Sequence, residues 1–264
     1  MSRLVLTALL AACGLVSADV TSPLPRAHAH NDYLHKRPLL DALAQGFCSV
    51  EADIFLVNGE LQVGHSKNQL RKGRTLESLY LSPLAERVRA NQGSVYPQKE
   101  RFILLVDIKS DGNEIYPVLD ALLERYRDML SGVAGQIHTE RGVRVILSGN
   151  RPRALVAADP TRYCAIDGRP SDFGSTESPT AVPLISDNWR NHFKWRGRGE
   201  FPVAEAARLQ EFVTRAHKEK RLIRFWGAPD NEQAWAILLK AGVDLVNTDH
   251  LQELAEFMKR QPEK

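Results

Sequence analysis

The feature that most constrains the fold is a regular alternation of short apolar runs with helical patterns. Eight runs have the length and composition of strands, at 26–30, 48–56, 102–108, 143–149, 164–167, 183–186, 222–226 and 243–247. Between them, helical periodicity is clearest at 39–45, 75–91, 117–131, 203–219, 231–241 and 250–260. Because alternating strands and helices indicate a parallel sheet, eight such units predict a closed (β/α)8 TIM barrel.

An open, doubly wound sheet is the alternative architecture. It is disfavoured because neither GxGxxG nor GxxxxGK[ST] follows an early strand. Residues 168–182 lack a helical pattern, so a loop is expected where a barrel would normally place a helix. No linker or internal repeat divides the chain, and we therefore expect one barrel domain over 19–264.

The first 18 residues have the pattern of an export signal. A charged start precedes an apolar run from Leu4 to Ala12, which is too short for the ~20 residues of a membrane span. Two processing routes stay open: lipidation of Cys13 in the lipobox-like LAAC, or cleavage after Ala18. Either route predicts an exported protein that is periplasmic, extracellular or attached to a membrane through lipidated Cys13.

The charge balance argues against nucleic acid as a partner. The formal net charge is only +3 over 264 residues, and no Lys/Arg run or basic-aromatic stripe occurs. We expect a monomer. Cys48 and Cys164 lie in apolar runs, which favours buried free thiols, although an exported protein could also join them in a disulfide.

Acidic residues end two of the first three predicted strands. Glu51 and Asp53 point to one side of their strand, and Asp107 ends the third strand. In a barrel these strand ends form the active face, where the side-chain carbonyl of Asn31 could add a fourth oxygen. An all-oxygen set suits Mg²⁺ or Ca²⁺ better than Zn²⁺. The alternative, which requires no metal, is that these acids form ion pairs with Arg or Lys, as Asp107 could with Lys109.

Two histidines flank the predicted cation site from separate loops. His30 follows the first strand, and His65 returns to the same rim after the second. Imidazoles on opposite sides of a phosphoryl group can act as general base and general acid. Lys109 adds a positive charge that could stabilise a pentacovalent phosphorane. The pattern predicts phosphodiester hydrolysis with catalytic His30, His65 and Lys109.

Two rival functions stay open. A metal-binding His-x-His at His28 and His30 would be typical of an amidohydrolase-like barrel with Zn²⁺ or Mn²⁺, which needs further histidines on later strands. A non-catalytic barrel could instead bind a phosphorylated lipid or glycan at the cell surface. Trp189, Phe193 and Trp195 would then form an aromatic platform, and Trp189 is a predicted substrate contact in either case.

The segments AHNDY (29–33), VEADIFLVNGELQVGH (50–65) and LLVDIK (104–109) resemble the phospholipase-C-like, glycerophosphodiester-phosphodiesterase-like barrel superfamily. The tail at 225–250 is similar to the last strand-helix-strand of glycerophosphodiesterases, which implies that Trp226 lines the mouth of the barrel. SVEADIFL, DGRPSDFG and LISDNWRNHFKWRG look like bacterial relatives of altered inheritance of mitochondria protein 6.

The resemblance implies catalytic His30 and His65 with auxiliary Lys109. It also implies that the metal ligands are Asn31, Glu51, Asp53 and Asp107. The expected substrate is a glycerophosphodiester or phospholipid-type diester. One departure is that glycerophosphodiesterases usually begin His-Arg-Gly, whereas this chain has His-Asn-Asp at 30–32. His28 is an additional histidine, expected to contact the substrate.

Overall fold

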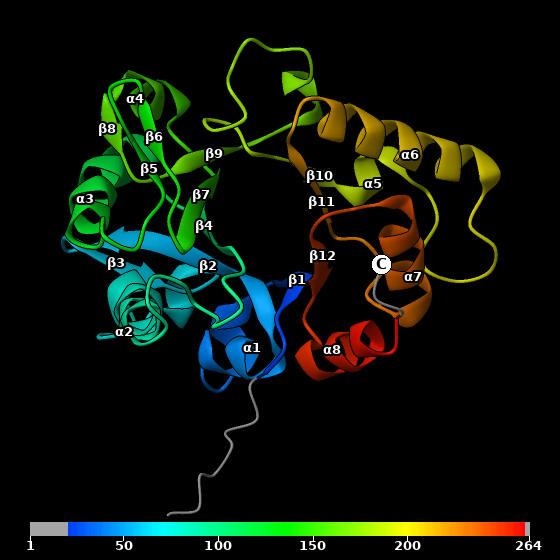
Figure 1. Ribbon diagram of the computed structural model, residues 1–264, viewed down its shortest axis with the longest axis horizontal. Helices are drawn as coiled ribbons and strands as arrows, with labels where there is room; N and C mark the ends of the chain where they lie inside the picture. The colour runs from blue at the N-terminus through cyan, green and yellow to red at the C-terminus, as the bar shows by residue number, and fades with distance from the viewer. Residues whose placement is uncertain (1–20, 262–264) are drawn as a thin grey trace, which may run out of the picture.

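A barrel of eight parallel strands forms the centre of the molecule in the computed structural model, which describes residues 21–261 (Figure 1). In spatial order the strands are β11 (Leu222–Trp226), β10 (Leu184–Asn188), β9 (Ala165–Gly168), β7 (Val143–Gly149), β4 (Phe102–Ile108), β2 (Phe47–Val57), β1 (Leu24–Ala29) and β12 (Val246–Thr248). β1 pairs with β12, and a parallel bridge between Arg224 and Leu245 brings the two ends of the sheet together. The predicted TIM barrel is confirmed, and each predicted strand overlaps an observed one.

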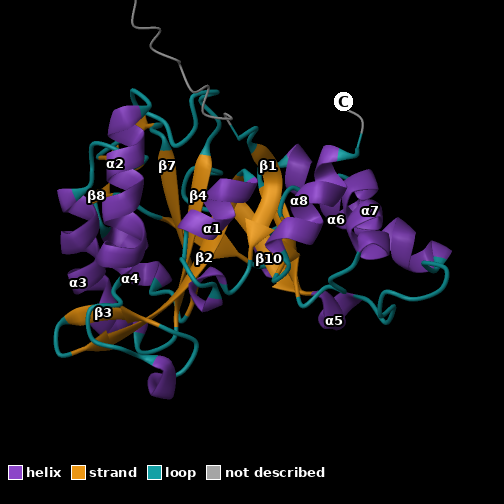
Figure 2. Cartoon of the chain, turned by 90° about the horizontal axis from the view of Figure 1, so that it is seen from below, coloured by secondary structure: helices purple, strands orange, loops and turns teal. Residues whose placement is uncertain are grey.

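Helices pack around the outside of the strands (Figure 2). They are α1 (Leu40–Gln45), α2 (Ser82–Ala90), α3 (Gly112–Arg125), α4 (Arg153–Ala158), α5 (Trp189–His192), α6 (Val203–Lys218), α7 (Glu232–Ala241) and α8 (Leu251–Lys259). α3 begins before the predicted residue 117, because the Asp111 side chain caps it by accepting a hydrogen bond from the backbone N–H of Asn113 at 2.8 Å. The predicted helix at 75–91 begins with a π-helical turn, Glu77–Leu81, before α2.

The segment after β9 is largely a loop, as predicted. Only a short 3-10 helix, Pro170–Asp172, follows β9 before β10. Short antiparallel strands were not predicted: β3 (Glu60–Val63) pairs with β2, and β5 (Gly132–Ala134), β6 (Ile137–Thr139) and β8 (Thr161–Arg162) form a separate small sheet. Strands of two to four residues carry too little periodicity to be recognised in a sequence.

The barrel interior has an apolar floor and a polar upper part. Side chains of alternate strand residues point inward, and one small cluster is apolar: Ile103, Leu105, Ile146, Leu184 and Leu245. Nearer the C-terminal strand ends, the buried side chains become polar: His28, Glu51, Ser148, Asp167, Ser186 and Arg224. Most of the buried polar side chains of the interior therefore lie at the end of the barrel where the candidate site lies, although Arg144 is buried near the start of β7.

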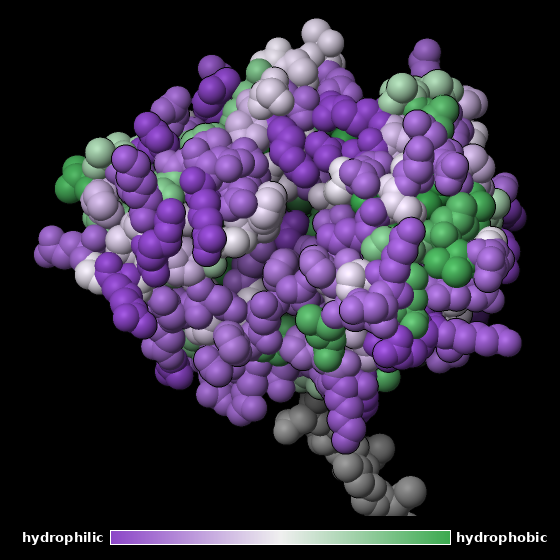
Figure 3. All heavy atoms as spheres, turned by 180° about the vertical axis from the view of Figure 1, so that it is seen from behind, coloured by the Kyte–Doolittle hydropathy of each residue, from purple (hydrophilic) through white to green (hydrophobic). Residues whose placement is uncertain are grey.

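The rest of the molecule has the surface and thiols of an ordinary globular domain. The face in Figure 3 is mainly hydrophilic, with smaller hydrophobic areas. Cys48 and Cys164 are free and buried, and burial raises the pKa of each thiol to about 12. Within residues 21–261, no helix combines the length and apolar character needed to cross a membrane. The predicted export signal, including Cys13, lies outside the described residues.

Candidate functional site

Three carboxylates meet at the C-terminal ends of β2 and β4. Asp53 and Asp107 are directly opposite each other in the parallel register, and Glu51 lies two residues earlier on β2. One oxygen from each of these three side chains lies within 4.8 Å of the other two. Glu51 and Asp53 are buried, so water screens the repulsion between their negative charges only weakly.

Two basic side chains partly compensate these acids. The Lys109 Nζ lies 3.1 Å from Asp53 Oδ2 and 3.2 Å from Asp107 Oδ2. From the opposite side of the barrel, Arg224 donates to Glu51 Oε2. The acids therefore do form ion pairs with Lys109 and Arg224, as the alternative without a metal predicted. This pairing is incomplete, because among residues 21–261 the three carboxylates pair with two such cations, Lys109 and Arg224.

The remaining charge and geometry fit a divalent cation. Asp53 Oδ1 is buried and has no hydrogen-bond partner among the described residues. The ion pairs of Glu51 and Asp107 fall on one oxygen of each carboxylate, Oε2 and Oδ2 respectively. A hard cation bound by these three side chains would satisfy Asp53 Oδ1 and neutralise the excess negative charge.

Burial and charge move the pKa values of the three acids in different directions. Burial raises the pKa of Asp107 to about 6, against the opposing effect of Lys109. Burial and the neighbouring Glu51 also raise the pKa of Asp53. Burial alone would raise the pKa of Glu51, but the Arg224 guanidinium, the hydrogen bond with His28 and the charge of His30 together outweigh it and hold this pKa well below its usual range. Glu51 is therefore the acid most firmly ionised.

Each of the two predicted catalytic histidines forms a pair with an aspartate. His65 Nδ1 lies 3.0 Å from Asp53 Oδ2, and His30 Nδ1 lies 2.8 Å from Asp249 Oδ1. A carboxylate at Nδ1 favours the tautomer with a proton there and leaves Nε2 free to exchange a proton. Burial lowers the pKa of His30, but the hydrogen bond to Asp249 and the negative charges of Glu51 and Asp249 together raise it by more.

Asn31 is connected to the acidic cluster through Tyr33. Its backbone is left-handed, with φ of 50°, and its Oδ1 accepts a 2.6 Å hydrogen bond from the Tyr33 hydroxyl. The same hydroxyl lies 2.8 Å from Asp53 Oδ2. Tyr33 thus links the side-chain carbonyl of Asn31 to the carboxylates.

Two of the three predicted substrate contacts are placed differently. His28 is fully buried between Ser49 Oγ at 2.7 Å and Glu51 Oε2 at 3.3 Å, and burial lowers its pKa to about 3. Trp189 is 1% exposed and packs against aromatic rings, including Phe193 at 4.0 Å between centroids. The prediction that His28 and Trp189 contact substrate is therefore wrong. Trp226 ends β11 and is 36% exposed, so it can reach a ligand at the barrel mouth.

Sequence reasoning did not identify Arg224, Asp249 or Tyr33 as parts of the site. Arg224 stands in the apolar run LIRFW, where a single charge in a buried strand is itself a signal of an internal partner. Asp249 follows β12 directly, the position where barrel strands present functional groups. Tyr33 had no distinguishing pattern.

The histidines do not form the metal site that an amidohydrolase would need. Within residues 21–261, the side chains grouped closely enough to bind a metal are the three carboxylates. Three later histidines, His138, His192 and His217, pair instead with Glu140, Asp187 and Asp244. The aromatic platform is not formed either, because Phe193 and Trp195 are buried like Trp189.

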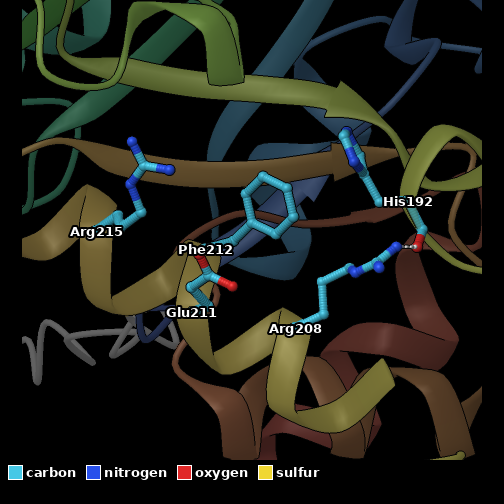
Figure 4. A pocket seen from close by; sticks show the side chains of 5 residues that line it. All are labelled: His192, Arg208, Glu211, Phe212 and Arg215. Atoms are coloured by element: carbon cyan, nitrogen blue, oxygen red, sulfur yellow. Dashed lines mark hydrogen bonds between the residues drawn. The ribbon is translucent and has the colours of Figure 1, made fainter. Parts of the chain in front are cut away.

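A separate hollow of about 240 Å³ lies between α5 and α6 (Figure 4). Arg208, Glu211, Phe212 and Arg215 of α6 line it together with His192. The His192 ring lies 2.8 Å from Asp187, and Arg208 donates to the His192 carbonyl at 3.1 Å. None of the clustered carboxylates or their paired histidines lines this hollow, so we assign the candidate site by its chemistry to the barrel mouth.

Gly149 keeps space for Asp107 at the end of β7. Its φ is +65°, and a Cβ there would lie 2.1 Å from Asp107 Oδ1 and 2.5 Å from the Ile108 carbonyl oxygen. Gly149→Ala is expected to lower the free energy of unfolding and to displace the Asp107 carboxylate. Gly59→Ala is the control, because Gly59 also has positive φ, +82°, with nothing within 4 Å of its Cβ position.

The two alanine variants separate backbone strain from the steric clash. A left-handed alanine costs roughly 1–2 kcal/mol in both variants. The clash should make Gly149→Ala less stable than Gly59→Ala by a further ~1–3 kcal/mol in urea denaturation. Equal stability of the two variants would show that Gly149 does not hold Asp107 in place.

Comparison with known proteins places this site in a family. Residues 15–166 match the AIM6-like phosphodiesterase domain, and residues 223–252 match the glycerophosphoryl diester phosphodiesterase family. Altered inheritance of mitochondria protein 6 from Eremothecium gossypii is 31% identical over 274 residues, which cover 89% of this chain and 69% of the relative. The homologue from Arthroderma benhamiae is 32% identical, with 88% and 83% covered.

Solved structures of low sequence identity share the fold. A putative glycerophosphoryl diester phosphodiesterase from Silicibacter pomeroyi has a TM-score of 0.53 at 14% identity and covers 91% of this chain and 96% of its own. A calcium-dependent phosphoinositol-specific phospholipase C from Pseudomonas has a TM-score of 0.57 at 12% identity, with 89% and 93% covered. These likenesses support the barrel architecture.

These relatives correct two predictions made from the sequence. The similarity to bacterial relatives was too narrow, because the curated relatives are fungal proteins. Their names refer to inheritance of mitochondria, which contradicts the predicted exported or envelope-anchored location. The extent of the match, together with the acidic cluster at the barrel mouth, identifies this chain as a member of the AIM6-like phosphodiesterase family.

Proposed function

We propose that the chain hydrolyses glycerophosphodiesters or phospholipid-type diesters with one divalent cation, Mg²⁺ or Ca²⁺. The observation that carries this proposal is the arrangement of three carboxylates within 4.8 Å, flanked by two histidines that each pair with an aspartate. Oxygen ligands favour these hard cations, and the paired imidazoles provide the proton transfers that diester cleavage requires. We further propose that the protein acts as a monomer and does not act on nucleic acid.

The mechanism follows from what the side chains can do at the barrel mouth. Glu51, Asp53 and Asp107 would hold the cation, which, when bound, supplies Lewis-acid activation of the phosphate. The Nε2 of His30 or His65 takes the proton from the attacking hydroxyl or water, and the other imidazole donates a proton to the leaving alkoxide. Lys109, 23% exposed, stabilises negative charge that develops on the phosphoryl oxygens. The assignment of base and acid depends on the direction in which the substrate binds.

Metal removal is the first test of this proposal. Hydrolysis of bis(p-nitrophenyl) phosphate and a glycerophosphodiester panel is expected to stop in EDTA and to return when Mg²⁺ or Ca²⁺ is added in excess. The reason is that Asp53 and Asp107 would lose the cation that neutralises them and the substrate phosphate. Initial rates in matched buffers, with Zn²⁺ as a third cation, measure the effect.

The other outcomes lead to different functions. Full activity in EDTA would contradict a cation-dependent mechanism and would leave Lys109 and Arg224 as the cations of the site. Turnover with Zn²⁺ alone would favour amidohydrolase-like chemistry. A folded protein that hydrolyses none of the diesters with any cation would favour a binding module.

A further inference from the structure

A second polar cluster lies inside the barrel on the side away from the histidines. At its centre is Asp167 of β9, which is fully buried. Its Oδ2 accepts hydrogen bonds from Ser148 Oγ at 2.7 Å, Ser186 Oγ at 2.7 Å and Arg169 Nη1 at 2.8 Å. These partners come from β7, β10 and the residue that follows β9. Asp167 therefore fixes the position of the Arg169 guanidinium.

One edge of the Arg169 guanidinium has no hydrogen-bond partner in the part of the chain that the structure describes. Its hydrogen bonds to Asp167, the Gly168 carbonyl and Ser186 all start from Nη1. Nε and Nη2 form the edge of a guanidinium that binds a carboxylate or phosphate with two parallel hydrogen bonds. The side chain is 27% exposed, so a ligand at the barrel mouth can reach this edge.

Arg151, in the loop after β7, is a second arginine close to Arg169 and Asp167. Its Nη1 donates to the Gly149 carbonyl at 3.0 Å, while its Nε is buried without a hydrogen-bond partner among the described residues. No carboxylate in residues 21–261 lies within ion-pair distance of Arg151, in contrast to Arg153, which pairs with Asp172 and Glu177. Burial lowers the pKa of Arg151, and the neighbouring positive charge of Arg169 lowers it further.

The two arginines lie on the same face as the acidic cluster. Asp107 of β4 is opposite Ser148 of β7 in the parallel register, and Ser148 donates to Asp167. Only β7 separates β4 from β9, so the two strands are roughly 10 Å apart. A substrate whose phosphate lies at the carboxylates and histidines could thus extend one arm toward Arg151 and Arg169.

We propose that Arg151 and Arg169 bind a second anionic group on one arm of the substrate, a carboxylate or a phosphate. This inference rests on the proposed diester hydrolysis and narrows its substrate class to diesters with an additional negative charge. Asp167, Ser148 and Ser186 hold Arg169 in place, and the incoming anion balances two guanidiniums that otherwise repel each other. Because Arg151 Nε is buried, the anion reaches this guanidinium through its terminal nitrogens.

Matched substrate pairs test this proposal and distinguish carboxylate from phosphate. Glycerophosphoserine differs from glycerophosphoethanolamine by a carboxylate, and glycerophosphoglycerol phosphate differs from glycerophosphoglycerol by a phosphate. The more acidic member of at least one pair should have a kcat/KM about tenfold higher or more, the size expected for a charge-assisted hydrogen bond. Arg169→Gln and Arg151→Gln should each bring that ratio close to one while leaving the less acidic member almost unaffected.

Arg153→Gln is the control variant. It removes the same charge two residues from Arg151, but this arginine is already paired with two carboxylates. Arg153→Gln should keep the wild-type ratio of kcat/KM between the more and the less acidic substrate. Loss of this preference in Arg153→Gln would indicate a general effect of positive charge and would overturn the proposed site. Thermal melting of each variant identifies any that fails to fold.

Direct binding separates failure of this inference from failure of the proposed function. Titration calorimetry with glycerol 1,3-bisphosphate and glycerol 3-phosphate should show tighter binding of the bisphosphate, and Arg169→Gln should abolish that preference. This outcome would support the anion site even in a protein without turnover. If the wild-type protein hydrolyses both substrate pairs with kcat/KM ratios near one, the anion site is overturned and the diesterase proposal remains intact.

Discussion

His65→Ala is expected to lower kcat for diester hydrolysis by about 10²–10⁴-fold, the usual contribution of a general acid or base. His65 Nδ1 is held 3.0 Å from Asp53, which leaves Nε2 as the atom that exchanges a proton with substrate. The side chain is 61% exposed, so its removal leaves no cavity in the core. Steady-state kinetics at saturating cation, with thermal melting of the same preparation, measure both effects.

His217→Ala provides a matched control for that experiment. His217 also pairs with an aspartate, Asp244 at 2.9 Å, but it lies near the end of α6, outside the barrel mouth. Its replacement should leave kcat unchanged. His30→Ala should resemble His65→Ala, and the double variant should lose less than the product of the two effects, because the histidines act in one reaction. Full activity in the double variant would exclude the two-histidine mechanism.

The barrel could be predicted because its strands are buried on both faces. Parallel strands covered by helices appear as nearly continuous apolar runs, and FILLVDI and VRVILSG match β4 and β7 in both bounds. The acids Glu51, Asp53 and Asp107 could be recognised as candidate functional residues because charged side chains are rare within such apolar runs. Strong local patterns therefore located both the fold and the carboxylates.

The remaining parts of the site depend on contacts between distant segments. Arg224 bonds to Glu51 across 173 residues of sequence, and Asp249 reaches His30 across 219. No local pattern encodes such pairs. Trp189 illustrates the converse error, because an aromatic-rich segment looks the same in sequence whether it packs inward or faces a ligand. Only the three-dimensional packing decides which occurs.

The three clustered acids of β2 and β4 are stabilised in two different ways. Glu51 pairs with Arg224 and His28 inside the barrel, whereas Asp53 and Asp107 share Lys109, and Asp53 also pairs with His65. Glu51 is thus held in place more firmly than the two outer carboxylates, and all three are the proposed ligands of the cation. Arg224 therefore has a structural role that can be tested without any substrate.

Arg224→Met is expected to lower the free energy of unfolding by about 3–5 kcal/mol near neutral pH, the usual cost of removing one partner of a buried ion pair. Arg224 is 3% exposed and donates to Glu51 and, at 2.8 Å, to Asn247 Oδ1. Methionine fills much of the same volume, so the main loss is the charge that compensates Glu51. Urea denaturation in EDTA measures this loss without a bound cation.

The effect of Arg224→Met should depend on pH. In the wild type the pKa of Glu51 is depressed, so this acid stabilises the fold above its unfolded pKa of about 4.3, and the contribution is lost as pH falls. Without Arg224, burial would raise that pKa above the unfolded value, and Glu51 would then destabilise the fold as pH rises. The difference between the two proteins should therefore already be present near pH 4.5, increase toward a maximum above pH 7, and decrease as pH falls well below 4.

A double replacement separates the buried charge from a simple packing defect. Arg224→Met combined with Glu51→Leu removes both charges and should recover most of the lost stability, because a buried ion pair can often be replaced by apolar residues without loss. The double replacement should also remove the contribution of Glu51 to the pH dependence of the free energy of unfolding. If the double variant is as unstable as Arg224→Met alone, the destabilisation arises from packing or from the lost bond to Asn247, and the isolated charge on Glu51 is not its cause.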